Sequence, residues 1–254
     1  MNRSLALMVL LAWSGVVTIA FGKGVSPSVQ VASTTVVVPT AANVVGATGS
    51  TFRTRISIFN PSAFSYAIEV VFHDVAGKTT TKSIPMSANQ LRVYDDFLGE
   101  VFSVTGAGSL EFDSQHIAGG SSDNQFVVNA EVWTISGGGR YGTSVTTSTA
   151  DGSPAEAYSP GIRVDSQFRS NVGCFNDSTE PNSVVADVFD ASSNLVNSIM
   201  LTVPAGAWAQ TAIPANVSSG YVRFRPSQSA FCWAVVVNNA TNDGHFILAS
   251  EFVP

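Results

Sequence analysis

The sequence predicts an all-β fold, with two tandem antiparallel β-sandwich domains after an N-terminal signal peptide. Three observations predict it. Apolar and polar residues alternate with a period of two, the alternating segments are short and separated by turn residues, and one block of sequence returns later in the chain. No long stretch shows the 3.6-residue period of an amphipathic helix, which argues against an α/β fold.

Residues 1–22 are predicted to be a secretory signal peptide. Arg3 provides a positive start, Leu5–Phe21 carries no charge, and Ala20 and Gly22 are small residues just before the expected cleavage site. An uncleaved anchor is the alternative, because about 18 apolar residues can just span a bilayer. The polar and small residues within the stretch favour cleavage.

The first sandwich is predicted to span residues 35–147, after an N-terminal arm of residues 23–34. Ile56 and Ile58 alternate with Arg55 and Ser57, as in a strand with one buried face. The expected strands are Thr35–Pro39 (weak), Arg53–Asn60, Tyr66–Asp74, Lys78–Pro85, Gln90–Asp95, Gly108–Asp113, Gln125–Ile135 and Arg140–Thr147. Only Asp96–Phe102 resembles a helical turn, with Asp96 as its cap.

The repeat relates residues 52–62 to residues 168–178 at a constant shift of 116. Further on, the alignment places Phe72 on Phe189, Gly77 on Asn194, Ile84-Pro85 on Val203-Pro204, Gly108–Phe112 on Gly220–Phe224, and residues 126–145 on 231–250. Chance similarity between two β-rich stretches is the alternative. The second sandwich is therefore predicted at residues 161–254, and the Ser-, Ala- and Pro-rich residues 148–160 as a linker.

Cys174 and Cys232 are expected to form a structural disulfide, because an exported chain meets an oxidising compartment. The repeat places Cys174 on Ile58 and Cys232 on Val127, an apolar pair whose separation in a sandwich also suits a disulfide. The cysteines are 58 residues apart, and the bond would stabilise the fold by about 4 kcal/mol in the chain-entropy model. Two buried free thiols are the alternative.

Composition excludes two classes of protein. The chain is 45% hydrophobic and 12% charged, whereas disordered chains combine low hydrophobicity with high net charge. Ser, Thr and Asn make up 68 of the 254 residues, so the chain is polar without being charged. With 12 basic and 18 acidic residues and no basic cluster, no nucleic-acid partner is expected.

No residue pattern predicts catalysis, and no catalytic residue, metal or cofactor is expected. The chain has no Gly-x-Ser-x-Gly motif, and His73, His116 and His245 lack metal-ligand spacing. Gly137–Gly142 matches a dinucleotide-binding pattern but joins two strands, so it is predicted to be a hairpin turn.

Two acidic pairs, Asp95 with Asp96 and Asp187 with Asp190, leave a Ca²⁺ site open, although no calcium-loop motif surrounds them. A glycosidase would need such acids paired across a cleft.

Trp208 is the candidate ligand-binding residue. It follows a turn at Pro204–Gly206 and is the tryptophan best placed for exposure, where its ring could stack on a sugar. Core packing is the alternative for Trp208, and it is the expected role of Trp133 and Trp233 in central strands.

Phe52–Ser62, Asp74–Gly77, Ile84-Pro85 and Gly108–Phe112 carry a recurring pattern. With it, the unit resembles a family of uncharacterised β-sandwich repeats in secreted and surface proteins of environmental bacteria. The second unit departs from the pattern, with Asp177 in place of the proline and Asn194 in place of the glycine. The resemblance implies an immunoglobulin-like or fibronectin-like fold and an extracellular setting, with no catalytic residue to transfer.

These features predict an exported, non-catalytic protein, secreted or at the cell surface, with the periplasm as a further location. Its expected role is structural, adhesive or in assembly, through uncovered edge strands that add to another copy or to a protein or glycan partner at the surface. Val29–Pro39 is a candidate donor strand, with a plain first strand as the alternative. A carbohydrate-binding module is the second hypothesis and a secreted hydrolase the third. No membrane span is expected after signal cleavage.

Overall fold

The computed structural model describes residues 32–46, 49–115, 120–149 and 151–251, and their fold is all-β, as predicted. The predicted signal peptide and residues 23–31 of the predicted arm lie outside the described residues, as does His116. The chain from Val31 onward forms one compact unit. Within the described ranges, every strand pair is antiparallel and the only helical element is the short turn η1 (Leu98–Phe102).

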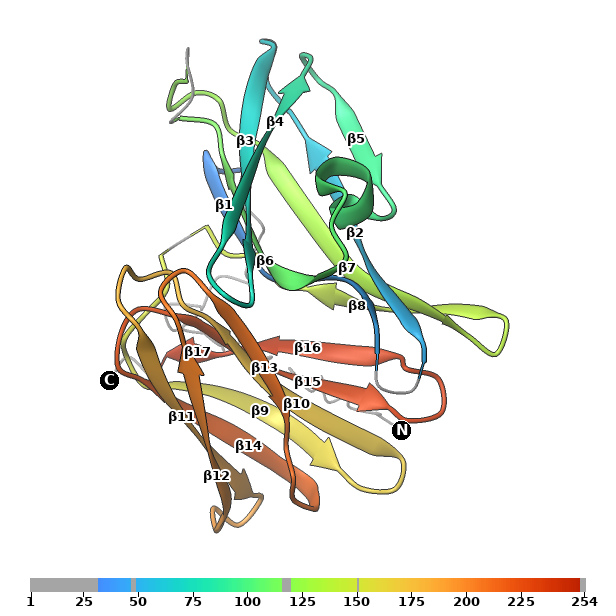
Figure 1. Cartoon of the computed structure of the whole chain (residues 1–254), viewed down its shortest axis with the longest axis vertical. Coiled ribbons are helices and arrows are strands. Elements are labelled where there is room, and N and C mark those ends of the chain that lie inside the picture. The colour runs from blue at the N-terminus through green and yellow to red at the C-terminus, as the bar shows by residue number, and fades with distance from the viewer. Residues whose placement is uncertain (1–31, 47–48, 116–119, 150, 252–254) are drawn as a thin grey trace, which may run out of the picture. The chain divides into compact units, whose positions relative to one another are not determined.

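The first half of the chain, β1 to β8, forms one folded sheet, drawn from blue to yellow-green in Figure 1. Its strands are β1 (Thr35–Val45), β2 (Thr51–Phe59), β3 (Tyr66–Asp74), β4 (Thr79–Met86), β5 (Leu91–Tyr94), β6 (Gly106–Asp113), β7 (Val127–Ser136) and β8 (Gly139–Val145). The order is β4-β3-β6-β1-β2-β7-β8, with β5 on β2. β1 pairs with β6 on both sides of a register shift between Val38 and Ala41, next to Pro39, and its last residues, Asn43–Val45, pair with β2.

The second half, β9 to β17, forms two sheets, drawn from yellow to red in Figure 1. Its strands are β9 (Ala157–Val164), β10 (Phe168–Phe175), β11 (Asn182–Asp190), β12 (Leu195–Val203), β13 (Trp208–Ala212), β14 (Val217–Pro226), β15 (Phe231–Asn238), β16 (Gly244–Leu248) and β17 (Ser250–Glu251). Their orders are β12-β11-β14-β9-β17 and β13-β10-β15-β16. These repeat the first-half orders β4-β3-β6-β1 and β5-β2-β7-β8.

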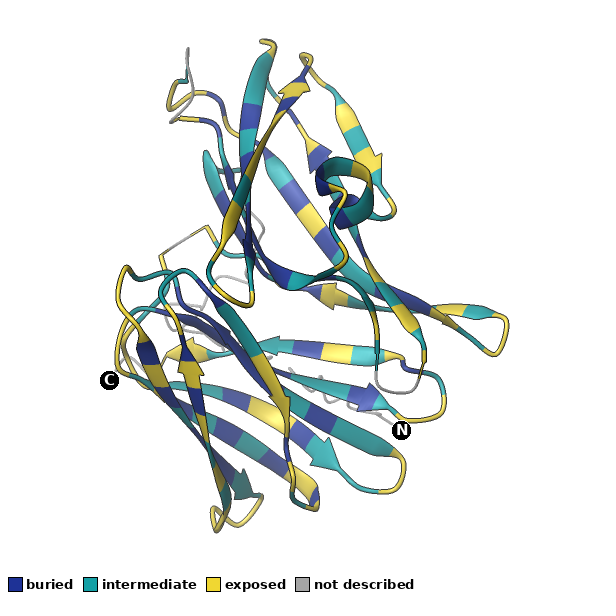
Figure 2. Cartoon of the chain, viewed as in Figure 1, coloured by how far each residue is buried: buried dark blue, intermediate teal, exposed yellow. Residues whose placement is uncertain are grey.

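The predicted alternation of apolar and polar residues along the strands identifies the side chains that form the core. Along β2 and β3, Ile56, Ile58, Ile68 and Val70 are buried, and Figure 2 shows the alternation of buried and more exposed residues along the strands. Each half has its own apolar cluster, but the cluster of the first half also takes in aromatic side chains of the second.

A buried asparagine organises the same corner in both halves. Asn60 Nδ2 donates to the carbonyl oxygens of Phe64 and Ser87, and its Oδ1 accepts from Ser62. Asn176 Nδ2 donates to the carbonyl oxygens of Glu180, Val203 and Pro204, and its Oδ1 accepts from Ser178. Both asparagines are 0% exposed, so the recurring Phe-Asn-x-Ser motif satisfies buried backbone carbonyls that would otherwise be costly.

Ladder registers correct the sequence alignment at three places. Pro85 lies opposite Ala67, and Thr202 lies opposite Ser183, which matches Ala67, so Pro85 corresponds to Thr202 and not to Pro204. The other two corrections are of one residue. Cys232 lies opposite Cys174, whereas the residue opposite Ile58 is Val128 and not Val127. In the turn after β3, Gly77 has φ +80°, and the matching turn has Ser193 at φ +63°, so Gly77 corresponds to Ser193 and not to Asn194. A shift of one residue exchanges the two faces of a strand, so these corrections decide which side chains point inward.

Two segments differ from expectation at their ends. Residues 157–160 of the predicted linker belong to β9, which pairs with β14 and β17. The candidate donor Val29–Pro39 contributes Thr35–Pro39 to β1, where Thr35–Val38 pair with β6 and Val37 also forms an isolated bridge to Ser148. The alternative of a plain first strand is confirmed for these residues.

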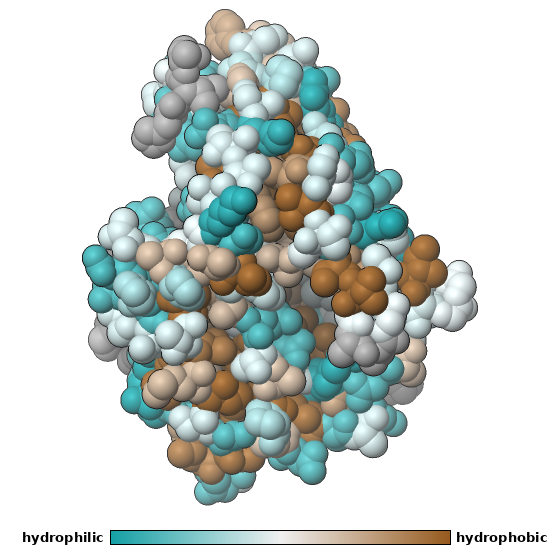
Figure 3. All heavy atoms as spheres, viewed as in Figure 1, coloured by the Kyte–Doolittle hydropathy of each residue, from teal (hydrophilic) through white to brown (hydrophobic). Residues whose placement is uncertain are grey.

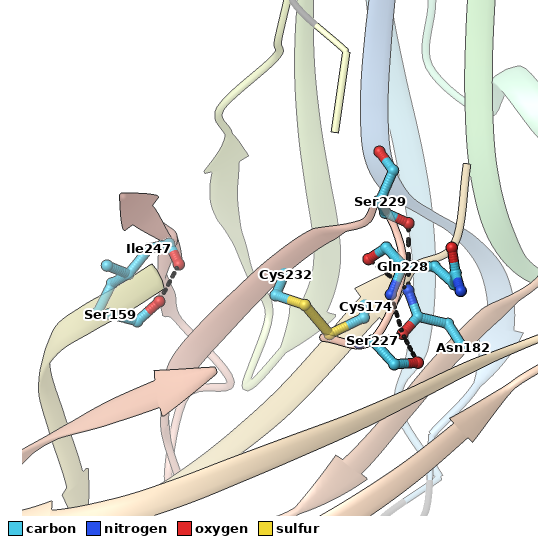
Figure 4. The surroundings of a disulfide bond; sticks show 8 residues. All are labelled: Ser159, Cys174, Asn182, Ser227, Gln228, Ser229, Cys232 and Ile247. Atoms are coloured by element: carbon cyan, nitrogen blue, oxygen red, sulfur yellow. Dashed lines mark hydrogen bonds between the residues drawn. A yellow bond between two sulfur atoms is a disulfide. The ribbon is translucent and has the colours of Figure 1, made fainter. Parts of the chain in front are cut away.

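The expected disulfide joins Cys174 of β10 to Cys232 of β15 inside the second-half core. Figure 4 shows its surroundings. Nearby, Asn182 Nδ2 donates to the carbonyl oxygens of Gln228 and Ser229, and Ser159 Oγ donates to that of Ile247. A buried disulfide favours an oxidising, extracytoplasmic environment.

Candidate functional site

The sheet β13-β10-β15-β16 of the second half has two buried faces. On β15, Cys232 and Ala234 belong to the second-half core, while Trp233 between them belongs to the cluster of the first half. The other aromatic residues that pack toward the first half are Phe175, Trp208, Phe231 and Phe246. Gly173 makes room for the indole, because a Cβ there would lie 2.5 Å from Cζ2 of Trp233.

Polar contacts connect the halves around this aromatic face. Asn242 Nδ2 donates to Ser50 Oγ at 3.1 Å. The His73 ring places Nδ1 3.2 Å from the carbonyl oxygen of Gly206 and packs edge-on against Phe175, with ring centroids 5.0 Å apart. His73 is therefore a hydrogen-bonded interface residue.

A cavity of about 420 Å³ lies between the aromatic face and strands β1, β2, β6, β7 and β8. This volume falls in the range of small-molecule sites, about 300–1,000 Å³. Its wall is mostly apolar, with Trp208 and Trp233 on one side and Phe52 and Val132 on the other. Both indole Nε1–H groups are buried and lack a hydrogen-bond acceptor among the described residues.

Arg169 is the cation in this cavity wall. Its guanidinium donates to Asn239 Oδ1 at 3.1 Å and to Asn242 Oδ1 at 2.8 Å. Burial lowers the pKa of Arg169 from its ordinary value. Among the described residues, no carboxylate forms an ion pair with it.

The structure places Trp208, the predicted ligand-binding residue, in this cavity wall. Its ring centroid lies 6.1 Å from that of Trp233. Trp208 is half-buried, so its ring is neither in the core nor fully open to solvent. Trp133 lies elsewhere, between Arg53 and Arg140, whose guanidinium carbons are 5.8 and 4.1 Å from its ring centroid. The sequence indicates Trp208 but not the cavity. Half of the wall comes from strands of the first half, more than 60 residues from Trp208 along the chain, and no local pattern shows that they lie together.

The first half presents the corresponding sheet face uncovered. Registers equate Phe59 with Phe175 and Leu91 with Trp208, because Leu91 lies opposite Phe59 and Trp208 opposite Phe175. Phe59 is 38% and Leu91 59% exposed, whereas Phe175 is 0% exposed. The same registers place the exposed Asn129 at the position of Trp233.

The edge strands of the two halves also differ. β4 and β12 occupy the same place at a sheet edge and each pairs with one neighbour. β4 carries Lys82 and Pro85, whereas β12 has nine residues with neither charge nor proline. Leu195 is 58% and Met200 70% exposed on β12, and Figure 3 shows hydrophobic residues at the surface in the region where Figure 1 draws β11 and β12.

Asp187, one of the acids weighed for calcium, is held by two arginines. Arg223 and Arg225 each place an Nη2 on its Oδ2, at 2.8 and 2.7 Å, and Ser198 Oγ donates to its Oδ1 at 2.8 Å. Desolvation raises the pKa of Asp187, but these hydrogen bonds outweigh it and the net shift is downward. Asp190 holds the β11–β12 turn by accepting from the backbone of Ser192 and Asn194.

The other acidic pair is also occupied by protein partners. Asp95 lies 3.5 Å from Arg140 and 3.6 Å from Arg55. Asp96 accepts from the backbone N–H of Gly99, which confirms its predicted role as a cap, and its own N–H donates to Glu100 Oε1. Throughout the described ranges, no group of three or more His, Cys, Asp or Glu side chains could hold a metal ion.

Comparison of the chain with family models, curated proteins and solved structures finds no match. Within the described residues, no helix has the length and hydropathy that a bilayer crossing requires.

Proposed function

We propose that the chain is an exported, non-catalytic β-sandwich protein of the cell surface or extracellular space, and that it assembles by strand addition along β12. The apolar start of the sequence and the buried disulfide support export. The matching strand orders and the two asparagine networks support an origin in two tandem sandwiches.

The unprotected edge of β12 carries the proposal. A strand at a sheet edge presents unpaired N–H and C=O groups, and natural proteins cover them or add lysine, proline or bulges. Among the described strands, β12 pairs with β11 alone; it carries no charge and exposes Leu195 and Met200. A bulge near Asn197 twists its start, and the ladder from Asn197 to Val203 is regular.

β4 shows what protection of the same edge requires in this fold. Lys82 lies opposite Val70, and Ile199 lies opposite Ala186, the residue that matches Val70. By the same registers, Pro85 of β4 corresponds to Thr202 of β12. β12 therefore lacks both features that block strand addition in β4.

The occupant of the β12 edge is the β12 of a second copy. Each copy presents the same uncharged strand, and two such strands can pair antiparallel about a two-fold axis. The same edge of each copy then supplies the hydrogen-bond partners for the other. Main-chain hydrogen bonds would give the affinity, and Met200 and Leu195 would bury apolar area across the pair.

The test measures the mass of the chain from Lys23 onward by size-exclusion chromatography with light scattering. The wild type should form dimers or larger assemblies. Met200→Lys should shift it to monomer, because the symmetric pair would bring two like charges together. Thr202→Pro, which restores the proline of β4, should do the same.

The matched control is Ser83→Lys in β4, the position that corresponds to Met200, and it should leave the mass unchanged. A wild type that stays monomeric at all concentrations contradicts the proposal, as does an assembly that survives both β12 variants.

A further inference from the structure

The cavity beneath the aromatic face has features that packing of the two halves does not require. Side chains fill the rest of this interface, as the cluster of Phe175, Phe231, Trp233 and Phe246 shows. At the cavity, the facing strands instead offer small side chains, such as Ala42, Ala107 and Ala212, around about 420 Å³ of space.

Several polar groups in the wall have no partner among the described residues. The side chains of Thr40, Thr143 and Asn171 are half-buried and that of Gln210 is exposed, and no side-chain hydrogen bond joins them to another described residue. The wall also holds Trp233, which is 0% exposed and whose Nε1–H has no acceptor among the described residues. Buried donors of this kind are normally satisfied by protein, water or a bound molecule.

The positive charge of Arg169 indicates that a ligand in this cavity would carry a negative charge. Arg53 stands at the same position of the first half, 116 residues earlier, where it lies 3.4 Å from the carboxylate of Asp96. Among the described residues, the hydrogen-bond partners of the Arg169 side chain are two amide oxygens, those of Asn239 and Asn242, and burial lowers the pKa of Arg169. A guanidinium in a mostly apolar wall is stabilised by an anionic oxygen.

We propose that this cavity binds a small amphipathic anion, whose apolar body lies between Trp208, Trp233, Phe52 and Val132 and whose carboxylate pairs with Arg169. The apolar wall excludes a sugar-like ligand with hydroxyl groups on every side, because most of them would be buried without partners. Asn171 and Gln210 are the hydrogen-bond partners for further oxygens on the ligand. This site is separate from the β12 edge, so the two proposals stand or fall independently.

The experiment uses the chain from Lys23 onward and two matched pairs of probes: decanoate with decanol, and 2-naphthoate with 2-naphthol. Calorimetry and tryptophan fluorescence report binding, because Trp208 and Trp233 line the cavity. At least one carboxylate should bind with a defined stoichiometry, and more tightly than its uncharged twin by about tenfold.

Variants locate the binding. Arg169→Gln should weaken the carboxylate by about tenfold and leave its uncharged twin unchanged. Ala212→Phe should abolish binding of both members of the pair, because the larger side chain fills the cavity. This substitution removes no polar group from the cavity wall. Arg53→Gln, at the corresponding position of the first half, is the control and should bind like the wild type.

Three results would overturn the proposal. One is failure of both carboxylates to bind the folded wild type. Another is equal binding of carboxylate and uncharged twin with no effect of Arg169→Gln. The third is undiminished binding by Ala212→Phe. Circular dichroism of each variant shows whether it is folded, and Ala212→Phe keeps the test valid if Arg169→Gln fails to fold.

Discussion

The two halves of the chain share a strand order and use the same sheet face in opposite ways. In the second half, the face of β13, β10 and β15 carries Phe175, Trp208 and Trp233 and packs on the first half. In the first half, the face of β5, β2 and β7 carries Phe59 and Leu91, which remain exposed.

The different use of this face follows from its outward-facing residues. Inward positions are apolar in both halves, because both sets of side chains fill an apolar core. Outward, the first half places Arg55 and Asn129 where the second has Asn171 and Trp233. This β fold can therefore gain or lose an interface by changing the side chains of one sheet face, while the apolar core and the strand order stay the same.

The largest effect is expected from the disulfide, which only the second half contains. Cys174→Ile with Cys232→Val installs the apolar type of pair found at Ile58 and Val128 and removes the cross-link. Unfolding free energy from urea denaturation should fall by about 4 kcal/mol, because the unfolded chain regains the freedom of a 58-residue loop. Intact masses with and without reductant check the wild-type bond, and two free thiols in exported protein would contradict it.

Removing the central aromatic side chain of the covered face comes next. Trp233→Ala should cost about 3 kcal/mol, at the lower end for such a truncation because the neighbouring cavity lets the site relax. Asn129→Ala at the corresponding exposed position should change stability by less than about 0.5 kcal/mol. Urea denaturation measures both, and similar costs would mean that the two faces are not used differently.

A smaller, pH-dependent effect is expected at Asp187, whose position in the first half is held by Val71. The folded pKa of Asp187 is lowered, so its stabilising effect is present at neutral pH and is lost as the pH falls through that lowered pKa, below 3.8. Asp187→Asn should cost about 1.5 kcal/mol at pH 7, and less as the medium is acidified. A cost that is constant from pH 7 to pH 2 would exclude the ion pairs with Arg223 and Arg225 as its source.

Local patterns predict the strands of the first half, the turn capped by Asp96 and the disulfide, whereas the strands of the second half are expected only through the repeat. Sequence similarity places Phe72 on Phe189, whereas the ladders equate it with Val188. It places Pro85 on Pro204, whereas the ladders equate it with Thr202, two residues earlier. Local patterns also missed the start of β9, where Pro160 and Gly161 resemble a linker.

The candidate site was less accessible from sequence. Trp208 was identified by its place after a turn, but the cavity forms only where strands of the two halves meet, and no local pattern encodes that contact. The β12 edge is different, because its lack of charge and proline is visible in the sequence. What the fold adds is that Leu195–Val203 lies at a sheet edge.

The central claim is that β12 is an assembly edge while β4, its counterpart, is protected. Hydrogen–deuterium exchange at low and high protein concentration tests it most directly. We predict that amides of β12 exchange more slowly as the concentration rises, with those of β4 unchanged, and that Met200→Lys removes the difference. Exchange in β12 that does not depend on concentration would contradict the account.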